Sequence, residues 1–466
     1  MVTRRSSSVG VTPKTEEATI AVLSGLAITW ILLPSDHPVD VFTTAAIGVG
    51  LSLILATGLE ATAGIRSLIR VDILMLWALY GLTLLEFLFP QPDVDTSVSA
   101  SGATSGTYAV LLGFAGLVVG RHVVAKRRRD LGASIHIRPK DIFFLFVLAA
   151  LLGYMHIFLA VNFDLLEVFR QMALPRFQQD WGRGQYGGDI HSLFVEIGAL
   201  IYLIPPIAGL ILARSNEYGA LKKVIVTVIL SFTFYYGFSS GTRNIIATYT
   251  ITFLGAYFMN RSTLTLWQVL YKGVPVLGIL AVGMVYMLQF RTEGLGNFSF
   301  SDGGPATLYV DHNLIVISQI AEVFPKLYDF LGLEIPVNTL IHPIPRIFWP
   351  GKPEGLSVGV EEAVGAPSGV TVACTFVGEA YMSGGLLAVL FFGLLFGAMA
   401  EMWNGVARNT NSPFAQLLYA SGFFSGMLTM RSMQWLTVAM LPTIALWLYG
   451  RLWIRRSGRS RASVQA

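Results

Sequence analysis

Long apolar runs separated by short polar segments recur along almost the whole chain. A membrane-spanning helix needs about 20 mostly apolar residues, and backbone groups in lipid must bond within their own segment. On this criterion the pattern predicts about twelve spans, at residues 18–33, 41–58, 72–90, 108–124, 141–161, 192–213, 223–239, 245–260, 266–289, 377–402, 413–430 and 433–454. We therefore expect an all-α, polytopic membrane protein in which residues 1–466 form a single transmembrane domain. A long loop, residues 290–376, is inserted between the ninth and tenth spans.

Basic residues are unevenly divided between the connecting segments. With the N-terminus placed in the cytoplasm, 23 of the 32 Lys and Arg residues fall on the cytoplasmic side and nine on the outer side. This asymmetry follows the positive-inside rule, which is independent of hydropathy. The sequence thus predicts a multi-pass protein with both termini in the cytoplasm and the 290–376 loop outside.

The amino-acid composition excludes several classes of protein and of functional site. Hydrophobic residues make up 54% of the chain and charged residues 13%, which excludes an ordinary soluble enzyme. The one cysteine, Cys374, excludes an internal disulfide and a thiolate metal cluster. Neither a P-loop nor a dinucleotide motif is present, and no metal-ligand spacing stands out. We expect no cofactor, no metal and no nucleic acid partner.

The nine outer basic residues are the first candidates for chemistry, since topology selects against them on that side. They are Arg170, Arg176, Arg183, Arg243, Arg291, Lys326, Arg346, Lys352 and Arg431. Arginine suits bidentate contact with phosphate oxygens, so a converging set predicts a site for a pyrophosphate or another anion. The alternative is solvated loop charge. Arg243 is the exception, because it lies in a very short turn between two apolar spans.

Aromatic residues add a second character to the outer loops. Trp181 and Tyr186 alternate with amides, Arg176, Arg183 and four glycines in the 162–191 loop, a composition suited to holding sugar rings. An interfacial aromatic belt is the alternative. In the long loop, residues 341–354 place four prolines around Arg346, Trp349 and Lys352, which predicts a stiff, non-helical wall. Upstream, residues 307–324 predict an amphipathic helix that carries Asp311 and His312 and lies on the bilayer or dips into it.

Short motifs in these loops resemble a known family. They are Ser240-Gly241-Thr242-Arg243, Ile344-Pro345-Arg346, Trp349-Pro350-Gly351-Lys352-Pro353, and Val377-Gly378-Glu379-Ala380-Tyr381 with Gly384-Gly385. Together they are similar to bacterial O-antigen and exopolysaccharide polymerases of the Wzy type. The resemblance covers the layout of most of the chain, but its specific motifs are short.

This resemblance implies a GT-C-like membrane glycosyltransferase in the bacterial inner membrane. It implies a polymerase that joins oligosaccharide repeats linked to polyprenyl pyrophosphate, at the outer face. Its partners would be that lipid-linked substrate, membrane lipid, and a chain-length regulator and flippase of the same pathway. The resemblance assigns Arg243, Arg291, Arg346 and Lys352 to the pyrophosphate. The glycan would contact Arg176, Trp181, Arg183, Tyr186 and Trp349.

The transfer also needs a base for the attacking hydroxyl. The candidates are His312, His342, Asp311 and Glu379. Histidine titrates near neutral pH, and His312, beside Asp311, resembles the histidine of the related ligase families. Either histidine has a capping or interfacial role as its alternative. Glu379 begins a span, where a carboxylate is costly, and it could instead pair with an arginine and hold the site together.

Three other readings compete with the polymerase. A transporter or flippase for lipid-linked glycan fits the number of spans, and Glu196 near Pro205-Pro206 supports it. An O-antigen ligase-like transferase would share the arginines and the base and would differ in its acceptor. A membrane scaffold for polysaccharide export leaves the outer arginines unexplained.

Overall fold

The computed structural model describes residues 14–34, 36–124, 135, 137–181, 194, 196–261, 265–295, 311–344, 348–353, 355–366, 372–408 and 412–462. Within these ranges every regular element is a helix. Seven helices there are long and apolar enough to cross a membrane: α1 (Thr15–Leu32), α2 (Pro38–Ala61), α5 (Ala100–Val123), α6 (Pro139–Ala160), α10 (Ala220–Ser239), α16 (Thr375–Ala407) and Met433–Leu452. The chain is therefore an all-helical protein embedded in a membrane.

The other predicted spans are helical too, but most are shorter or interrupted. They are α3 (Val71–Thr83) with the 3-10 turn η2 (Leu85–Leu88), η4 (Gly198–Leu203) with α9 (Ile204–Ala213), α11 (Arg243–Met259), α12 (Leu266–Glu293), and α17 (Pro413–Ser421) with α18 (Phe423–Arg431). Met433–Leu452 consists of η6 (Met433–Trp435) and the first part of α19 (Leu436–Ala462). Pro205 and Pro206 at the start of α9 and Gly422 between α17 and α18 account for two of these interruptions, which hydropathy alone does not reveal.

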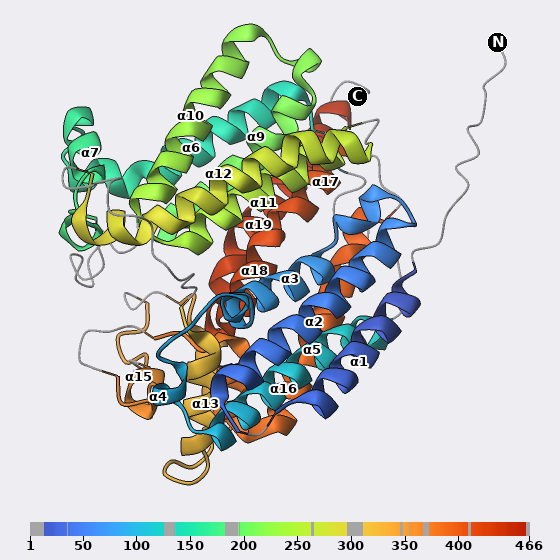
Figure 1. Cartoon of the computed structure of the whole chain (residues 1–466). Helices are drawn as coiled ribbons and strands as arrows, with labels where there is room; N and C mark the ends of the chain where they lie inside the picture. Colours follow the sequence, from blue (N-terminus) through green and yellow to red (C-terminus); the bar gives the residue numbers. More distant parts are fainter. Residues whose placement is uncertain are drawn as a thin grey trace, which may run out of the picture.

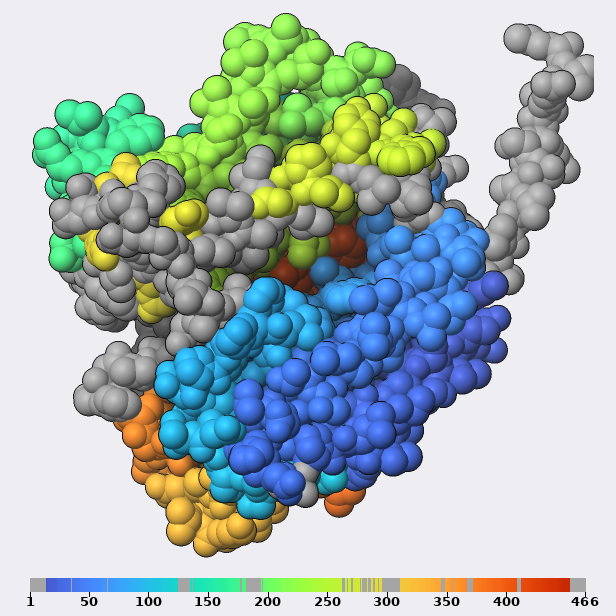
Figure 2. All heavy atoms as spheres, viewed as in Figure 1, coloured from blue at the N-terminus to red at the C-terminus, as the bar shows by residue number. Residues whose placement is uncertain are grey.

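The helices form two groups joined by the last three. Helices α1, α2, α3, α5 and α16 pack together, and α6, α9, α10, α11 and α12 form the second group (Figure 1). Helices α17 and α18 contact members of both groups, and α19 contacts η4 of the second group. Figure 2 shows a hollow between the two groups, with the C-terminal helices at its floor. Side chains from both groups can therefore meet along this boundary.

Glycines allow the closest helix contact, between α5 and α16. A methyl group added at Gly116 would lie 2.8 Å from Cα of Gly393. One added at Gly120 or Gly397 would clash with a backbone carbonyl of the opposite helix. Small residues that let two backbones approach are the usual basis of helix association in membranes. This contact makes α16 a fixed support for the residues that it carries.

Helix α16 is broken near its start. Gly384 and Gly385 leave helical geometry, and Gly385 has a φ of 65°, which favours glycine. The break frees the carbonyls of Met382 and Ser383. The backbone amides of Leu331 and Gly332 donate to these carbonyls at 2.8 and 2.9 Å. The long loop thus closes the gap that the two glycines open in the helix.

The long loop contains more helix than its composition predicts. Its described helices are α13 (Asn313–Val323), α14 (Glu334–Ile341) and α15 (Val360–Ala363). Leu314, Ile317 and Ile320 of α13 are fully buried, and the helix packs against α5 and α16. Its polar Asn313 and Ser318 are buried as well, so of the two expected placements this packing fits a helix that dips into the bilayer better than one that lies on its surface.

Candidate functional site

Arginines from the second helix group meet where a tight turn joins α10 to α11. The Ser240-Gly241-Thr242 turn needs glycine, since Gly241 has a φ of 62° and lies against the Arg291 side chain at the end of α12. A Cβ at Gly241 would be 2.7 Å from Cβ of Arg291. Arg243 follows as the first residue of α11. The turn therefore places two of the predicted arginines side by side.

Acidic groups from the first helix group face these arginines. Arg243 is half-buried and lies within electrostatic range of Asp311, Glu86 and Arg291. Glu86 is buried in η2, directly after α3. Asp311 lies just before α13. The site thus draws its charges from both sides of the boundary between the two helix groups.

Arg431, the last residue of α18, connects the acidic and the basic sides. Its guanidinium lies 3.5 Å from the Asp311 carboxylate. With the amide oxygen of Asn244 turned toward it, Arg431 also donates to Asn244 from Nε at 3.0 Å and Nη1 at 3.1 Å. Three arginines therefore converge with two carboxylates, and we call Glu86, Arg243, Arg291, Asp311, His312 and Arg431 the arginine cluster.

Asp311 and His312 have backbone conformations that side-chain-bearing residues rarely adopt. Their φ angles are 120° and 51°, and both precede the first turn of α13. Such conformations persist where the surrounding structure holds them, and they are frequent at functional sites. The buried α13 supplies that support, and its Asn313 side chain donates to the Leu82 carbonyl at 2.7 Å. The two candidate bases are thus held in place by packing.

His312 combines a carboxylate neighbour with access to a cavity. Its Nδ1 lies 3.9 Å from Oε2 of Glu86. Burial lowers the pKa of His312 below its ordinary value, and the carboxylates of Asp311 and Asp93 oppose that shift. A cavity of about 150 Å³ adjoins the ring and is lined by Gln91, Pro92, Asp93, Val94, Ser97, His312, Ile315 and Gln319. A neutral imidazole beside a partly polar cavity can accept a proton.

Glu379 contacts the residues that directly follow Arg431 in the chain. It is buried near the start of α16 and accepts hydrogen bonds from the Ser432 hydroxyl, from the Met433 amide at 2.6 Å and from the Gln434 side chain at 3.4 Å. These donors form the turn that directly follows Arg431. Glu379 therefore holds this turn through Ser432, Met433 and Gln434, whereas the predicted pairing with an arginine is not among the contacts of the described residues.

Other predicted residues form a second group at the end of α14. Lys352 Nζ donates to the carbonyls of His342 at 2.9 Å and Ile344 at 3.1 Å, which satisfies carbonyls at the helix end. The His342 ring packs 4.8 Å from Trp435. Trp349 is exposed nearby in sequence. In this geometry Lys352 binds carbonyls at the end of α14, and His342 makes an aromatic contact with Trp435.

The 162–191 loop, which the sequence predicts to contact glycan, is only partly described. Arg176 lies in η3 (Arg176–Gln178), and Trp181 is half-buried against the core. Between them, the buried Gln179 donates to the Ser239 carbonyl at 3.2 Å, beside the turn that precedes Arg243. The loop therefore adjoins the arginine cluster. Arg183, Tyr186 and Arg346 lie outside the described residues.

Sequence reasoning overlooked part of this cluster. Glu86 lies inside the predicted span 72–90, where a carboxylate is costly, so the signal was present. Arg431 was one of the nine outer basic residues, but nothing local distinguished it from the others. Among the described residues, no group of three or more His, Cys, Asp or Glu side chains is arranged to hold a metal ion.

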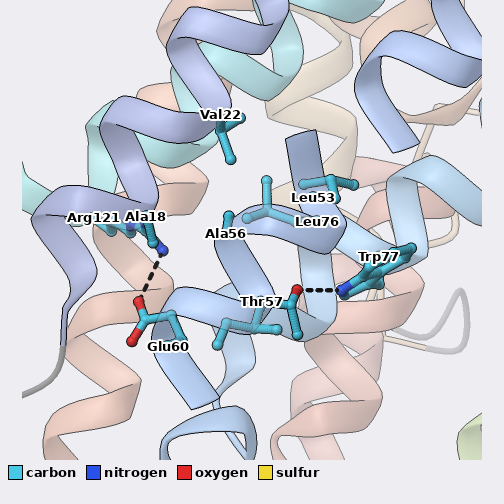
Figure 3. Close-up of a pocket in the computed structure, with 10 residues that line it drawn as sticks. Ala18, Val22, Leu53, Ala56, Thr57, Glu60, Leu76, Trp77 and Arg121 are labelled. Atoms are coloured by element: carbon cyan, nitrogen blue, oxygen red, sulfur yellow. Dashed lines mark hydrogen bonds and ion pairs between the residues drawn. The ribbon is translucent and has the colours of Figure 1, made fainter. Parts of the chain in front are cut away.

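A second charged region, which no motif predicted, lies where α1, α2, α3, α5 and α16 meet. Asp72 is 2.7 Å from Arg70 and 3.1 Å from Arg121, and it accepts from Asn404 at 2.7 Å. Arg121 also lies 3.8 Å from Glu60, beside a small and mostly apolar pocket (Figure 3). We call Glu60, Arg70, Asp72, Arg121, Glu401 and Arg408 the buried ion network. Its three positive and three negative charges balance.

Comparisons with known proteins add one match. A family model described as a domain of unknown function, DUF8712, matches residues 314–436. This range runs from α13 to the start of α19 and includes Glu379 and Arg431. No curated protein matches the chain. No solved structure matches it either.

Proposed function

We propose that the protein is a membrane glycosyltransferase that joins oligosaccharide repeats carried on polyprenyl pyrophosphate into a surface polysaccharide. The observation that carries this proposal is the arginine cluster, in which Arg243, Arg291 and Arg431 converge from three separate connections. The carboxylates of Glu86 and Asp311 lie among these arginines, and all belong to a chain embedded in a membrane. Convergent guanidinium groups suit a pyrophosphate at a lipid headgroup.

The proposed architecture has more membrane spans than the seven helices of membrane-crossing length. It has about twelve spans in a GT-C-like arrangement, with interrupted helices such as α17 and α18 also crossing the bilayer. The protein would lie in the bacterial inner membrane with both termini in the cytoplasm. The arginine cluster would then face outward. A chain-length regulator and a flippase of the same pathway are the proposed partners.

In the proposed reaction, a sugar hydroxyl of one lipid-linked repeat attacks the anomeric carbon of another. The new glycosidic bond forms as the bond to the pyrophosphate oxygen breaks, and polyprenyl pyrophosphate leaves with the bonding electrons. His312 takes the hydroxyl proton, since burial lowers its pKa and keeps the imidazole neutral. Arg243 and Arg291 stabilise the charge that develops on the leaving group.

The carboxylates of the cluster orient these groups. Glu86 lies 3.9 Å from the His312 ring, and Asp311 holds Arg431 at 3.5 Å. A carboxylate beside a catalytic histidine sets its tautomer and stabilises its protonated form. The cavity next to His312 offers room for part of a sugar residue. Arg176 and Trp181, in the loop that adjoins the cluster, would contact the glycan.

The test is in-cell polymerisation in a strain that lacks this gene. The strain is complemented with wild type, Arg243→Ala or Arg243→Lys at matched membrane expression. Loss of one such charge typically lowers turnover by about 100-fold. We therefore expect Arg243→Ala to accumulate lipid-linked single repeats, and Arg243→Lys to recover part of the polymer because it keeps the charge but not the bidentate contact.

Arg170→Ala is the matched control. Arg170 is 69% exposed on α7 (Leu165–Met172) and pairs only locally with Glu167, so its loss should leave the polymer unchanged. Wild-type polymer from Arg243→Ala would overturn the proposed site. Complete polymer that remains on its lipid carrier without the gene would indicate a ligase. Single repeats retained on the cytoplasmic side would indicate a flippase.

A further inference from the structure

Helix α14 in the long loop exposes large apolar residues on its outward face. Leu333, Val337 and Leu340 are 75%, 50% and 69% exposed. They recur at intervals of four and three residues and therefore line one face of the helix. Continued into the next turn, the same spacing reaches Ile344, which is 38% exposed. The exposed face of α14 is thus a continuous aliphatic stripe.

The opposite side of α14 is packed on the protein. Ile335 and Thr339 are buried, and the Asn338 side chain donates to Gln434 at 2.9 Å. Glu334 accepts from the Ser357 hydroxyl at 2.7 Å. The inner face of the helix therefore combines the apolar Ile335 with polar contacts, while Leu333, Val337 and Leu340 face outward. A surface helix in water would instead carry polar residues on its outward face.

The stripe continues a surface that already belongs to the membrane. Just before α14, Phe330 packs over the break in α16, 3.1 Å from where a Gly385 side chain would begin, and edge-on to Tyr381. Directly after the break, α16 exposes Leu387 and Phe391, which are 82% and 60% exposed. Helix α16 is one of the seven helices of membrane-crossing character. The exposed apolar surfaces of α14 and α16 therefore adjoin at the glycine break.

We propose that α14 lies in the membrane interface with Leu333, Val337 and Leu340 immersed in the acyl chains of the leaflet that surrounds the broken end of α16. An interfacial helix of this kind binds through its buried apolar area. The amides of Leu331 and Gly332, bonded to α16, fix its depth. This anchor would hold the 311–344 segment, including Asp311 and His312, at the membrane surface. It does not depend on the proposed reaction.

Site-directed fluorescence quenching tests this placement, because the chain has one cysteine and it is buried. In a Cys374→Ala background, Leu340→Cys and Val337→Cys are labelled with bimane and reconstituted into phospholipid vesicles. Leu387→Cys on α16 is the lipid-facing reference. Glu362→Cys on α15 is the aqueous reference, since Glu362 is an exposed polar residue of the same loop. Quenchers are phospholipids brominated on their acyl chains and, separately, aqueous iodide.

The proposal predicts that brominated lipid reduces the fluorescence at 337 and 340 as strongly as at 387, and that iodide acts mainly at 362. Iodide quenching at 340 equal to that at 362 would place the stripe in water and overturn the proposal. Protection from both quenchers would show that protein, such as a second copy of this chain, covers the stripe, and would also overturn it. Two labelled positions guard against a local effect of either substitution.

Discussion

The molecule contains two clusters built from the same residue types, and they differ in the burial of their carboxylates. In the buried ion network, Glu60, Asp72 and Glu401 are each at most 3% exposed, although Arg408 at its edge is 28% exposed. In the arginine cluster, Glu86 is buried, whereas the pair of Asp311 and Arg431 is 40% and 32% exposed. Carboxylates that are all buried are closed to a ligand, whereas an exposed pair of carboxylate and arginine is accessible to one.

The two clusters also differ in the helices that they connect. The buried ion network joins α2, α3, α5 and α16 within the first helix group. The arginine cluster instead brings together Arg243 of α11, Arg291 of α12, Arg431 of α18 and the carboxylates of Glu86 and Asp311. Similar pairs of Arg and Asp or Glu thus lie inside one helix group in one place and join separate elements in the other. Single substitutions test this distinction.

The largest effect is expected in the buried ion network. Asp72→Ala removes a carboxylate shared by Arg70, Arg121 and Asn404. It leaves Glu60 as the remaining carboxylate within 4 Å of both arginines. Loss of one member of a buried ion pair costs about 3–5 kcal/mol. We expect a much smaller folded fraction in detergent by size-exclusion chromatography and a lower thermal midpoint. Asp141→Ala, which breaks a pair with the exposed Arg138, is the matched control and should cost at most about 1 kcal/mol. Equal stability of the two variants would contradict the structural role of the network.

A smaller effect, on activity and not on folding, is expected from Glu379→Gln. The amide keeps the shape of the side chain but weakens its bonds to Ser432 and Met433, so the turn after Arg431 loosens. Loss of a charged hydrogen-bond acceptor corresponds to a decrease of about tenfold in polymer formation. The effect should not add to that of Arg431→Ala, because both act through the same guanidinium.

Glu401→Gln is the counterpart in the buried ion network. Glu401 contacts Arg408 and Arg70, so its neutralisation should lower thermal stability and leave the activity per folded molecule unchanged. A stability loss from Glu379→Gln as large as that from Glu401→Gln would remove the contrast between the two clusters. Additive effects of Glu379→Gln and Arg431→Ala would separate Glu379 from Arg431.

The smallest expected effect is on the pH dependence of polymerisation. Burial lowers the pKa of His312 below 6.5, so the neutral, basic form dominates at neutral pH and activity should fall only as pH decreases through that lowered pKa. The Asp93 carboxylate raises this pKa, and Asp93→Asn should therefore move the acid limb to lower pH. Membrane vesicles from the producing strain, assayed across the acid range, provide the measurement. An acid limb that does not move, or moves to higher pH, would argue against His312 as the base.

Several features of the site were predictable because they are local in sequence. The short turn that contains Gly241 and Arg243 was identified from its position between two apolar runs, and the structure shows why glycine is needed there. The paired Gly384-Gly385 stood out as part of a short motif, and the structure has it as a break inside α16. Local composition indicates such breaks but does not show what packs against them.

Other features could not be read from the sequence. Asp311 meets Arg431, and Asp72 meets Asn404, across more than 100 and 300 residues respectively. Nothing near Asp72 in sequence distinguishes a buried network residue from a charge at the end of a span. The local pattern of α13 left two placements open, on the bilayer or dipping into it, because it does not reveal that α5 and α16 pack against the helix.

The sequence by itself determined that this is an all-helical membrane protein, where its apolar helices lie, and that arginine near the ends of helices is the residue type to examine. Hydropathy and helical period are properties of consecutive residues, so they can be read from the sequence alone. Only the tertiary structure decided which charges meet, which are closed off in a balanced network and which remain open. Those outcomes depend on packing between distant helices, where close contacts such as that of Gly116 with Gly393 set the relative placement of side chains far apart in the chain.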